Sequence, residues 1–235
     1  MRRMKLCDAH RFRVGVALLS LACAASGNVW AQTAAPPVAE DVLSVARPRE
    51  ALSVAAYGAV WTNSRFLTFP YNAVTGNLTF ERAYAAGAIA AMPVKTFSVG
   101  VPGLPYRFDG VTLEVETTLL RHFGGQRHSE AAGALVLRSG EFRLPGNLSM
   151  NVAFGNGLSY AFEDAALEIG KTGRTGVETY RLQYHMSVET AFSSVAFPNA
   201  SLFVRLHHRS GVYGVISPRR SGSNLLGGGL RWTFY

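Results

Sequence analysis

The chain has 235 residues, of which 48% are hydrophobic and 16% are charged, and its formal net charge is +8. This length accommodates one domain. The positive charge is not accompanied by a basic patch or a recognised nucleic-acid-binding motif, so we predict no nucleic-acid partner.

The first 31 residues have the pattern of a secretory signal peptide. Five basic residues, the last of them Arg13, precede an apolar run at 14–25, and the sequence Val29-Trp30-Ala31, which ends on a small residue, predicts cleavage after Ala31. The apolar run is shorter than the roughly 20 residues that a membrane-spanning helix needs. A lipoprotein signal ending at Cys23 is the weaker alternative, because Ser20 occupies the position where such a signal usually has Leu.

Cleavage changes both the charge and the cysteine content of the chain. The signal contains Cys7 and Cys23, so the mature protein has no cysteine, and neither disulfides nor cysteine-ligated metals are expected. It also contains five of the 23 Lys+Arg and one of the 15 Asp+Glu, which leaves 18 and 14 and a net charge of +4. The high basicity is therefore partly a property of the signal.

Residues 32–50, rich in Ala, Pro and acidic residues, predict a periplasmic leader or linker. No later stretch has 18 consecutive apolar residues, which argues against helical membrane spans. Instead, residues 51–235 contain eight strand-like segments, of which the second is interrupted by Pro93. Each is about as long as a tilted membrane strand or slightly longer. Their approximate limits are 51–63, 83–96, 110–123, 131–143, 149–161, 178–192, 200–210 and 223–235.

The segment 200–210 shows how the strands are two-faced. Leu202 and Val204 alternate with Arg205, His207 and Arg209. Alternation alone also fits a soluble sandwich with its apolar side inward. The row of cationic or titratable groups, and the aromatic-rich last strand, favour the reverse arrangement. We therefore predict an all-β fold, an eight-stranded antiparallel transmembrane β-barrel of the outer-membrane type, located in the bacterial outer membrane.

Charges inside such a barrel require partners. The predicted inward row of 110–123 contains Glu114 and Glu116, and an eight-stranded lumen is filled by side chains. Because a buried unpaired charge is costly, we expect an ion-pair network, with Arg181, Arg205 and Arg231 as candidate cations. A filled lumen also disfavours a solute pore.

Connection lengths predict the orientation of the barrel. With the amino end in the periplasm, the turns at 144–147 and 197–199 face the periplasm, and the longest connections, 64–82 and 162–177, face outward. The connection 97–109 is long for its periplasmic side. Around the last outer loop, Arg209, Arg219 and Arg220 either bind lipopolysaccharide phosphates or are solvated, and the sequence favours neither.

One group of polar side chains has catalytic potential. His208 and Ser210 are two residues apart, so they share the outward face of one strand, and Asn224 lies on the corresponding row of the next strand. A nucleophile, a base and a third group that orients the base form the general pattern of an activated serine. A His and a Ser at the rim of a barrel are also common without any catalytic role.

These residues resemble the outer-membrane lipid A deacylase family, the PagL-like 3-O-deacylases. The resemblance implies an eight-stranded barrel with Ser210 as nucleophile, His208 as general base and Asn224 in the place of the family's Glu. Two departures weaken the match: Gly211 stands where the family usually has an Asn that is a potential oxyanion donor, and Asn224 lacks the charge of a carboxylate. Exchanging the acid for its amide in a Ser-His-Asp protease lowers the rate about 10⁴-fold.

The predicted function is hydrolysis of an acyl ester of lipid A through a serine nucleophile, with lipid A or lipopolysaccharide as partner. The alternative is a non-enzymatic small barrel that binds lipopolysaccharide or supports the envelope. Neither function implies a metal or an organic cofactor. The oligomeric state is not determined by the sequence.

Overall fold

The computed structural model describes residues 51–100, 107–168, 180–217 and 221–235. The predicted signal peptide, 1–31, and leader, 32–50, lie outside the described residues. The elements are β1 (Ser53–Thr62), η1 (Phe66–Thr68), α1 (Phe69–Val74), β2 (Phe80–Gly100), β3 (Arg107–Gly124), β4 (Ser129–Arg138), β5 (Phe142–Leu144), β6 (Leu148–Ala161), β7 (Leu182–Ser194), β8 (Phe197–Ser210), η2 (Val212–Gly214) and β9 (Gly222–Thr233).

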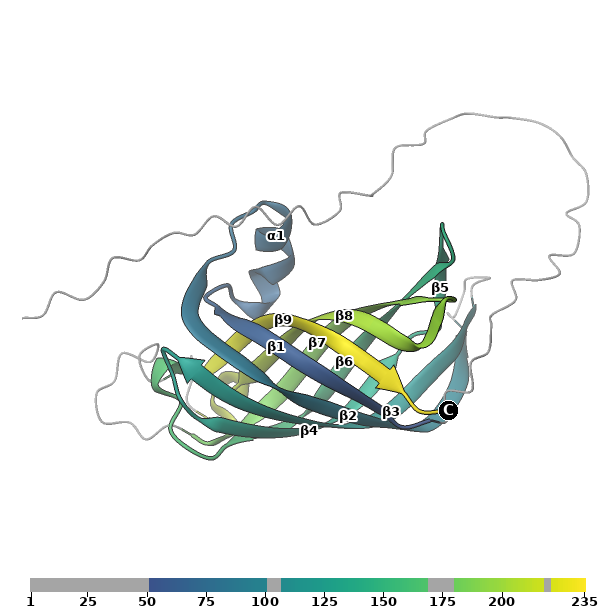
Figure 1. Ribbon diagram of the computed structural model, residues 1–235. Helices are drawn as coiled ribbons and strands as arrows, with labels where there is room; N and C mark the ends of the chain where they lie inside the picture. The colour runs from purple at the N-terminus through teal and green to yellow at the C-terminus, as the bar shows by residue number, and fades with distance from the viewer. Residues whose placement is uncertain (1–50, 101–106, 169–179, 218–220) are drawn as a thin grey trace, which may run out of the picture.

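Eight of these strands form a closed antiparallel ring. The order is β4-β3-β2-β1-β9-β8-β7-β6, and pairing of β4 with β6 closes it. The short β5 pairs with β6 alone within the described residues and extends that hairpin beyond one end of the ring (Figure 1). The predicted eight-stranded antiparallel barrel is therefore confirmed. No helix in the described part of the chain is long and apolar enough to cross a bilayer.

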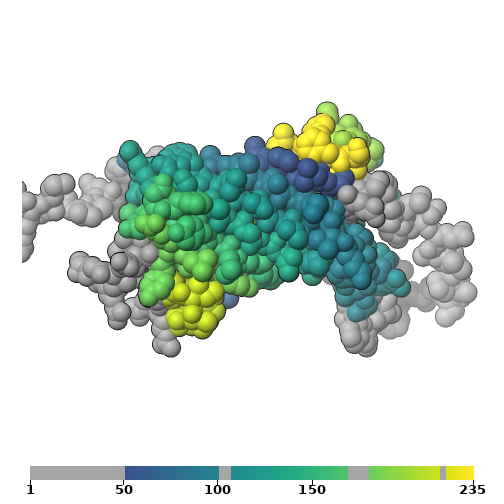
Figure 2. Space-filling view, turned by 90° about the horizontal axis from the view of Figure 1, so that it is seen from below, coloured from purple at the N-terminus to yellow at the C-terminus, as the bar shows by residue number. Residues whose placement is uncertain are grey.

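The barrel has apolar side chains on its outer surface and charged side chains in its interior, which is the reverse of a soluble protein. On β8, Leu202 and Val204 face outward and are 64% and 44% exposed, whereas Arg205, His207 and Arg209 face inward and are at most 1% exposed. Leu230 and Trp232 on β9, and Phe234 directly after this strand, are likewise exposed. Figure 2 shows part of this outer wall as a continuous surface. An apolar exterior around a charged interior is the organisation of a transmembrane β-barrel of the bacterial outer membrane.

The centre of the lumen contains the predicted ion-pair network. Glu189 accepts hydrogen bonds from Arg138 (3.0 Å), Arg205 (3.0 Å) and Arg231 (2.9 Å). Arg205 also pairs with Glu116. The network therefore joins strands that are far apart in sequence across the barrel, and it neutralises the carboxylates that the sequence placed inside.

Glu114 completes the network, and two predicted cations have a different role from the one expected. Glu114 pairs with Arg138 at 2.9 Å, a partner that the sequence analysis did not name. Arg181 is wrong as an interior partner: its side chain is 47% exposed and lies 3.5 Å from Asp164. Arg209 is neither solvated nor available to lipopolysaccharide, because it is buried and donates to Glu168 at 2.8 Å. Arg219 and Arg220 lie outside the described residues.

Several boundaries differ from the predictions. Pro93 does not end the second strand, because a register shift between Pro93 and Lys95 accommodates it, and β2 continues to Gly100. The long connection predicted at 97–109 is thereby reduced to 101–106. The predicted turn at 197–199 lies within β8, and the turn itself is at 195–196. The turn at 144–147 is confirmed, with positive φ at Gly146 and Asn147, as tight hairpins require.

The lumen has a cavity at the end where the β5–β6 hairpin lies. Its volume is about 80 Å³, and it is lined by residues that include Glu114, Arg138 and Arg231. These are the same side chains that form the ion-pair network.

Because Glu189 serves three guanidinium groups, Glu189→Gln should lower the free energy of unfolding by about 3–5 kcal/mol, the cost of breaking a buried ion pair. The measurement is a urea unfolding curve in detergent or lipid. The matched control is Asp109→Asn, which removes an exposed pair with Arg107 and should leave the midpoint unchanged. Equal midpoints for the two variants would contradict the central role of Glu189.

Candidate functional site

The two ends of the barrel differ in their connections. His208 and Ser210 lie at the end that has the connections 63–79, 125–128, 162–181 and 211–221. The opposite end has the connections 101–106 and 195–196 and the β5–β6 hairpin turn. Outer-membrane barrels have short periplasmic turns and longer extracellular loops. The end with His208 and Ser210 therefore faces the cell exterior.

The structure joins two of the three predicted site residues directly. His208 and Asn224 are opposite each other on β8 and β9, and His208 Nδ1 lies 2.6 Å from Asn224 Oδ1 and 3.1 Å from the backbone oxygen of Ser223. Asn224 Nδ2 donates to the backbone oxygen of Ser64 at 2.6 Å, which fixes the orientation of the amide. Because both neighbours of Nδ1 are acceptors, Nδ1 carries the ring hydrogen. The lone pair is then on Nε2, the form needed in a general base.

The connection between β1 and β2 covers this pair from outside the barrel. The ring of Phe66 in η1 stacks on His208, with centroids 4.7 Å apart. Together with the bond from Asn224 to Ser64, this contact explains why Asn224 is only 5% exposed on an outward-facing row. The polar pair is therefore shielded from lipid by a segment in which the sequence analysis had expected only a long loop, and which contains η1 and α1 (Figure 1).

Ser210 lies beside the pair but is not joined to it. The strand rise of about 3.3 Å per residue puts its Cα roughly 6.6 Å from that of His208, on the same face. The hydrogen bond that the structure gives its hydroxyl comes from the backbone N–H of Val212 at 3.2 Å. A rotation about χ1 of Ser210 is thus needed before its hydroxyl donates to His208.

Gly211 is required by the loop that follows Ser210. A Cβ at this position would lie 2.5 Å from Ser217 O and from Ser221 Oγ. Its carbonyl oxygen accepts the N–H groups of Gly214, Ile216 and Ser217 at 3.1–3.3 Å. The Asn of the resembling family therefore has no space here, and a side-chain oxyanion donor at this position is excluded by packing.

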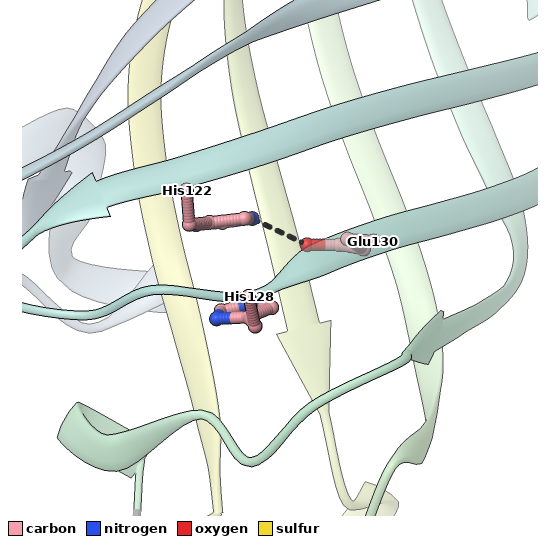
Figure 3. Close-up of side chains that lie close together, drawn as sticks. All are labelled: His122, His128 and Glu130. Carbon is pink, nitrogen blue, oxygen red and sulfur yellow. Dashed lines mark hydrogen bonds and ion pairs between the residues drawn. The ribbon is translucent and has the colours of Figure 1, made fainter.

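A second cluster at the same end lies inside the barrel and was missed by the sequence analysis. His122 on β3, His128 in the connection and Glu130 on β4 are all buried, and His122 Nε2 lies 3.0 Å from Glu130 Oε2 (Figure 3). Burial and the neighbouring His122 lower the pKa of His128 to about 3, so its imidazole is neutral. The period-2 alternation of the sequence could have placed the His122 side chain inside the barrel. It could not have placed that of His128, because this residue is not on a strand.

Comparison with known proteins gives similarity in fold only. No family model matches the chain, and no curated protein matches it. Two solved structures are similar in fold. The structure of the outer membrane enzyme PagL has 10% sequence identity and a TM-score of 0.49, and the match covers 77% of this chain and 99% of PagL. The structure of Neisserial surface protein A has 13% sequence identity and a TM-score of 0.44, and the match covers 78% of this chain and 97% of that protein.

If Asn224 anchors the covering segment, Asn224→Ala should release it. Loss of one buried hydrogen bond, about 1 kcal/mol, should make tryptic cleavage after the exposed Arg65 roughly fivefold faster, as measured by mass spectrometry of the fragments. The control is Asn77→Ala, which removes a bond to Thr75 within the same connection and should not change the rate. An unchanged cleavage rate in Asn224→Ala would show that the bond to Ser64 does not hold the segment.

Proposed function

We propose that the protein is an outer-membrane ester hydrolase that removes an acyl chain from lipid A, with Ser210 as nucleophile, His208 as general base and Asn224 as the residue that orients the base. The observation that carries the proposal is the fixed tautomer of His208. Two acceptors at Nδ1 put the lone pair of the ring on Nε2, and His208 is on the outward face at the extracellular end. That position is level with the outer leaflet, where lipid A resides.

In the proposed reaction, Ser210 Oγ attacks the ester carbonyl carbon while its proton passes to His208 Nε2. The tetrahedral intermediate then breaks its bond to the sugar oxygen, which takes the proton from Nε2 and leaves as an alcohol. Water then gives a proton to the same nitrogen and attacks the carbonyl carbon of the acyl-serine. The bond from this carbon to Ser210 Oγ breaks, Oγ takes the proton back from Nε2, and the fatty acid is released. The Val212 N–H, which donates to Ser210 Oγ at 3.2 Å in the resting state, is our candidate donor to the oxyanion.

The covering segment suggests how an acyl chain is accommodated. Phe66 gives the imidazole an apolar flank, and the outward row of β8 continues it with Val204 and Leu202. An acyl chain lying along this row would remain in an apolar environment up to the reacting carbon. Because Asn224 orients His208 but cannot offset the charge of the imidazolium, we expect a slow enzyme.

The test of the activity is mass spectrometry of lipid A from cells that produce the protein. Lipid A should lose one hydroxyacyl chain with the wild type but not with Ser210→Ala. The matched control is Ser201→Ala, a serine near the opposite end of β8, which should behave as the wild type. Identical lipid A in all strains would refute the proposal and favour a non-enzymatic barrel.

The role of Asn224 has a separate test. Asn224→Asp keeps the acceptor at His208 Nδ1 and adds the charge that stabilises the imidazolium, so the initial rate of deacylation in detergent micelles should rise, by up to about 10⁴-fold. The carboxylate also loses the bond to Ser64 O, which should loosen the covering segment. Asn224→Leu, which removes the acceptor, should lower the rate. A lower rate in Asn224→Asp than in the wild type would contradict the assigned role.

A further inference from the structure

The hairpin formed by β3 and β4 brings three potential metal ligands together inside the barrel. His122, His128 and Glu130 each offer one ligand atom, and these atoms lie within 4.8 Å of one another. A backbone bond from His122 N to His128 O, 2.8 Å long, closes the hairpin at this point. All three ligands thus come from one local element, as Figure 3 shows, and their separation is set by the hairpin.

His128 is the residue whose state calls for an explanation. It is fully buried, yet neither of its ring nitrogens has a hydrogen-bond partner within the described residues. A buried polar group without a partner costs free energy that a ligand would recover. The ring stacks face to face on His122, with centroids 3.9 Å apart, and no hydrogen bond holds it in that orientation. A metal ion bound by this cluster would require the ring to turn so that one nitrogen points toward Glu130.

A metal-bound histidine usually has a hydrogen-bond partner for its other ring nitrogen, and Gln126 is in position to bond Nδ1 of His122. Gln126 Nε2 lies 3.1 Å from His122 Nδ1, and Gln126 Oε1 has no partner within the described residues. Rotating the amide by 180° places Oε1 opposite an Nδ1–H group and satisfies both atoms. The lone pair of His122 is then on Nε2, the nitrogen that already faces Glu130. An outer hydrogen bond of this kind is the usual support of a metal-bound histidine.

The charged side chains around Glu130 are compatible with a bound cation. Glu130 Oε1 is held by Ser159 at 2.7 Å and by His207 at 2.8 Å, so Oε2 is the oxygen on the side of His122. The nearest guanidinium, that of Arg209, lies 3.8 Å from Glu130 and is bonded to Glu168 at 2.8 Å. Two carboxylates, those of Glu130 and Glu168, therefore lie beside one guanidinium in this part of the lumen.

We propose that His122, His128 and Glu130 form a Zn²⁺ site at the extracellular end of the lumen. Two imidazole nitrogens and one carboxylate oxygen are a known ligand set for zinc, which completes its tetrahedron with water. Bonds of about 2.0–2.2 Å require the ligand atoms to approach one another, and the turn of the His128 ring supplies this movement. The site is separate from the proposed hydrolase site, which lies on the outer face of the wall.

The experiment uses the mature protein, extracted from membranes without a histidine tag, treated with a chelator and held in detergent. Isothermal titration with Zn²⁺ should show one ion bound per chain, and Co²⁺ at the same site should give the visible absorption of a four-coordinate ion. His128→Phe keeps the stacked ring but removes the ligand, and it should weaken Zn²⁺ binding more than 100-fold. Gln126→Ala should weaken it 10–100-fold, as loss of an outer hydrogen bond does.

The matched control is His185→Phe. His185 is a buried lumen histidine whose two ring nitrogens have no hydrogen-bond partner in the part of the chain that the structure describes. It is not one of the three proposed ligands, so its substitution should leave the affinity unchanged. Circular dichroism verifies that each variant retains its strands. The proposal is overturned by a wild type that binds neither ion, or by a His128→Phe variant that binds Zn²⁺ as tightly as the wild type.

Discussion

Glu189 accepts hydrogen bonds from three guanidinium groups in the middle of the lumen, and this interaction supports the rest of the barrel. The arginines come from β4, β8 and β9, and Arg205 extends the contact to Glu116 on β3. Charges of this kind are tolerated inside a small barrel only when each is paired, because an unpaired buried charge is costly. The network thus fixes which face of each strand points inward.

The outward face follows from the same constraint. Once the charged rows are inside, the apolar rows form the outer wall, and a polar side chain on that wall needs a partner or a cover. His208 and Asn224 have both, because they bond to each other and the segment with Ser64 and Phe66 lies over them. This combination distinguishes the pair from incidental rim residues, and it produces the histidine tautomer on which the proposed chemistry depends.

One strand separates two different environments at the extracellular end. His207 and His208 are neighbours on β8, but His207 points inward to Glu130 and His208 points outward to Asn224. The inner environment is a histidine and carboxylate cluster suited to a cation. The outer one is a shielded polar pair beside an apolar surface. The alternation of the strand keeps the two apart although they are one residue distant in sequence.

The sequence by itself determined the inside and the outside of this protein. Period-2 alternation assigned Glu114 and Glu116 to the lumen and Val204 to the exterior, because side chains on a strand point to opposite faces regardless of what they meet there. It also placed His208, Ser210 and Asn224 on adjacent outward rows. The strand ends were less predictable, as Pro93 and the turn at 195–196 show, because bulges and turns depend on the neighbouring strand.

Only the tertiary structure decided which groups meet. Arg138, rather than Arg181, pairs with Glu114 because the register of the neighbouring strands β3 and β4 puts the two side chains close together in the lumen, and the connection after β1 covers Asn224 because it folds back over the wall. The cluster of His122, His128 and Glu130 depends on the geometry of one hairpin. Alternation specifies the direction of a side chain, whereas its partner is set by strand register and loop path, which the contacts of the whole barrel determine.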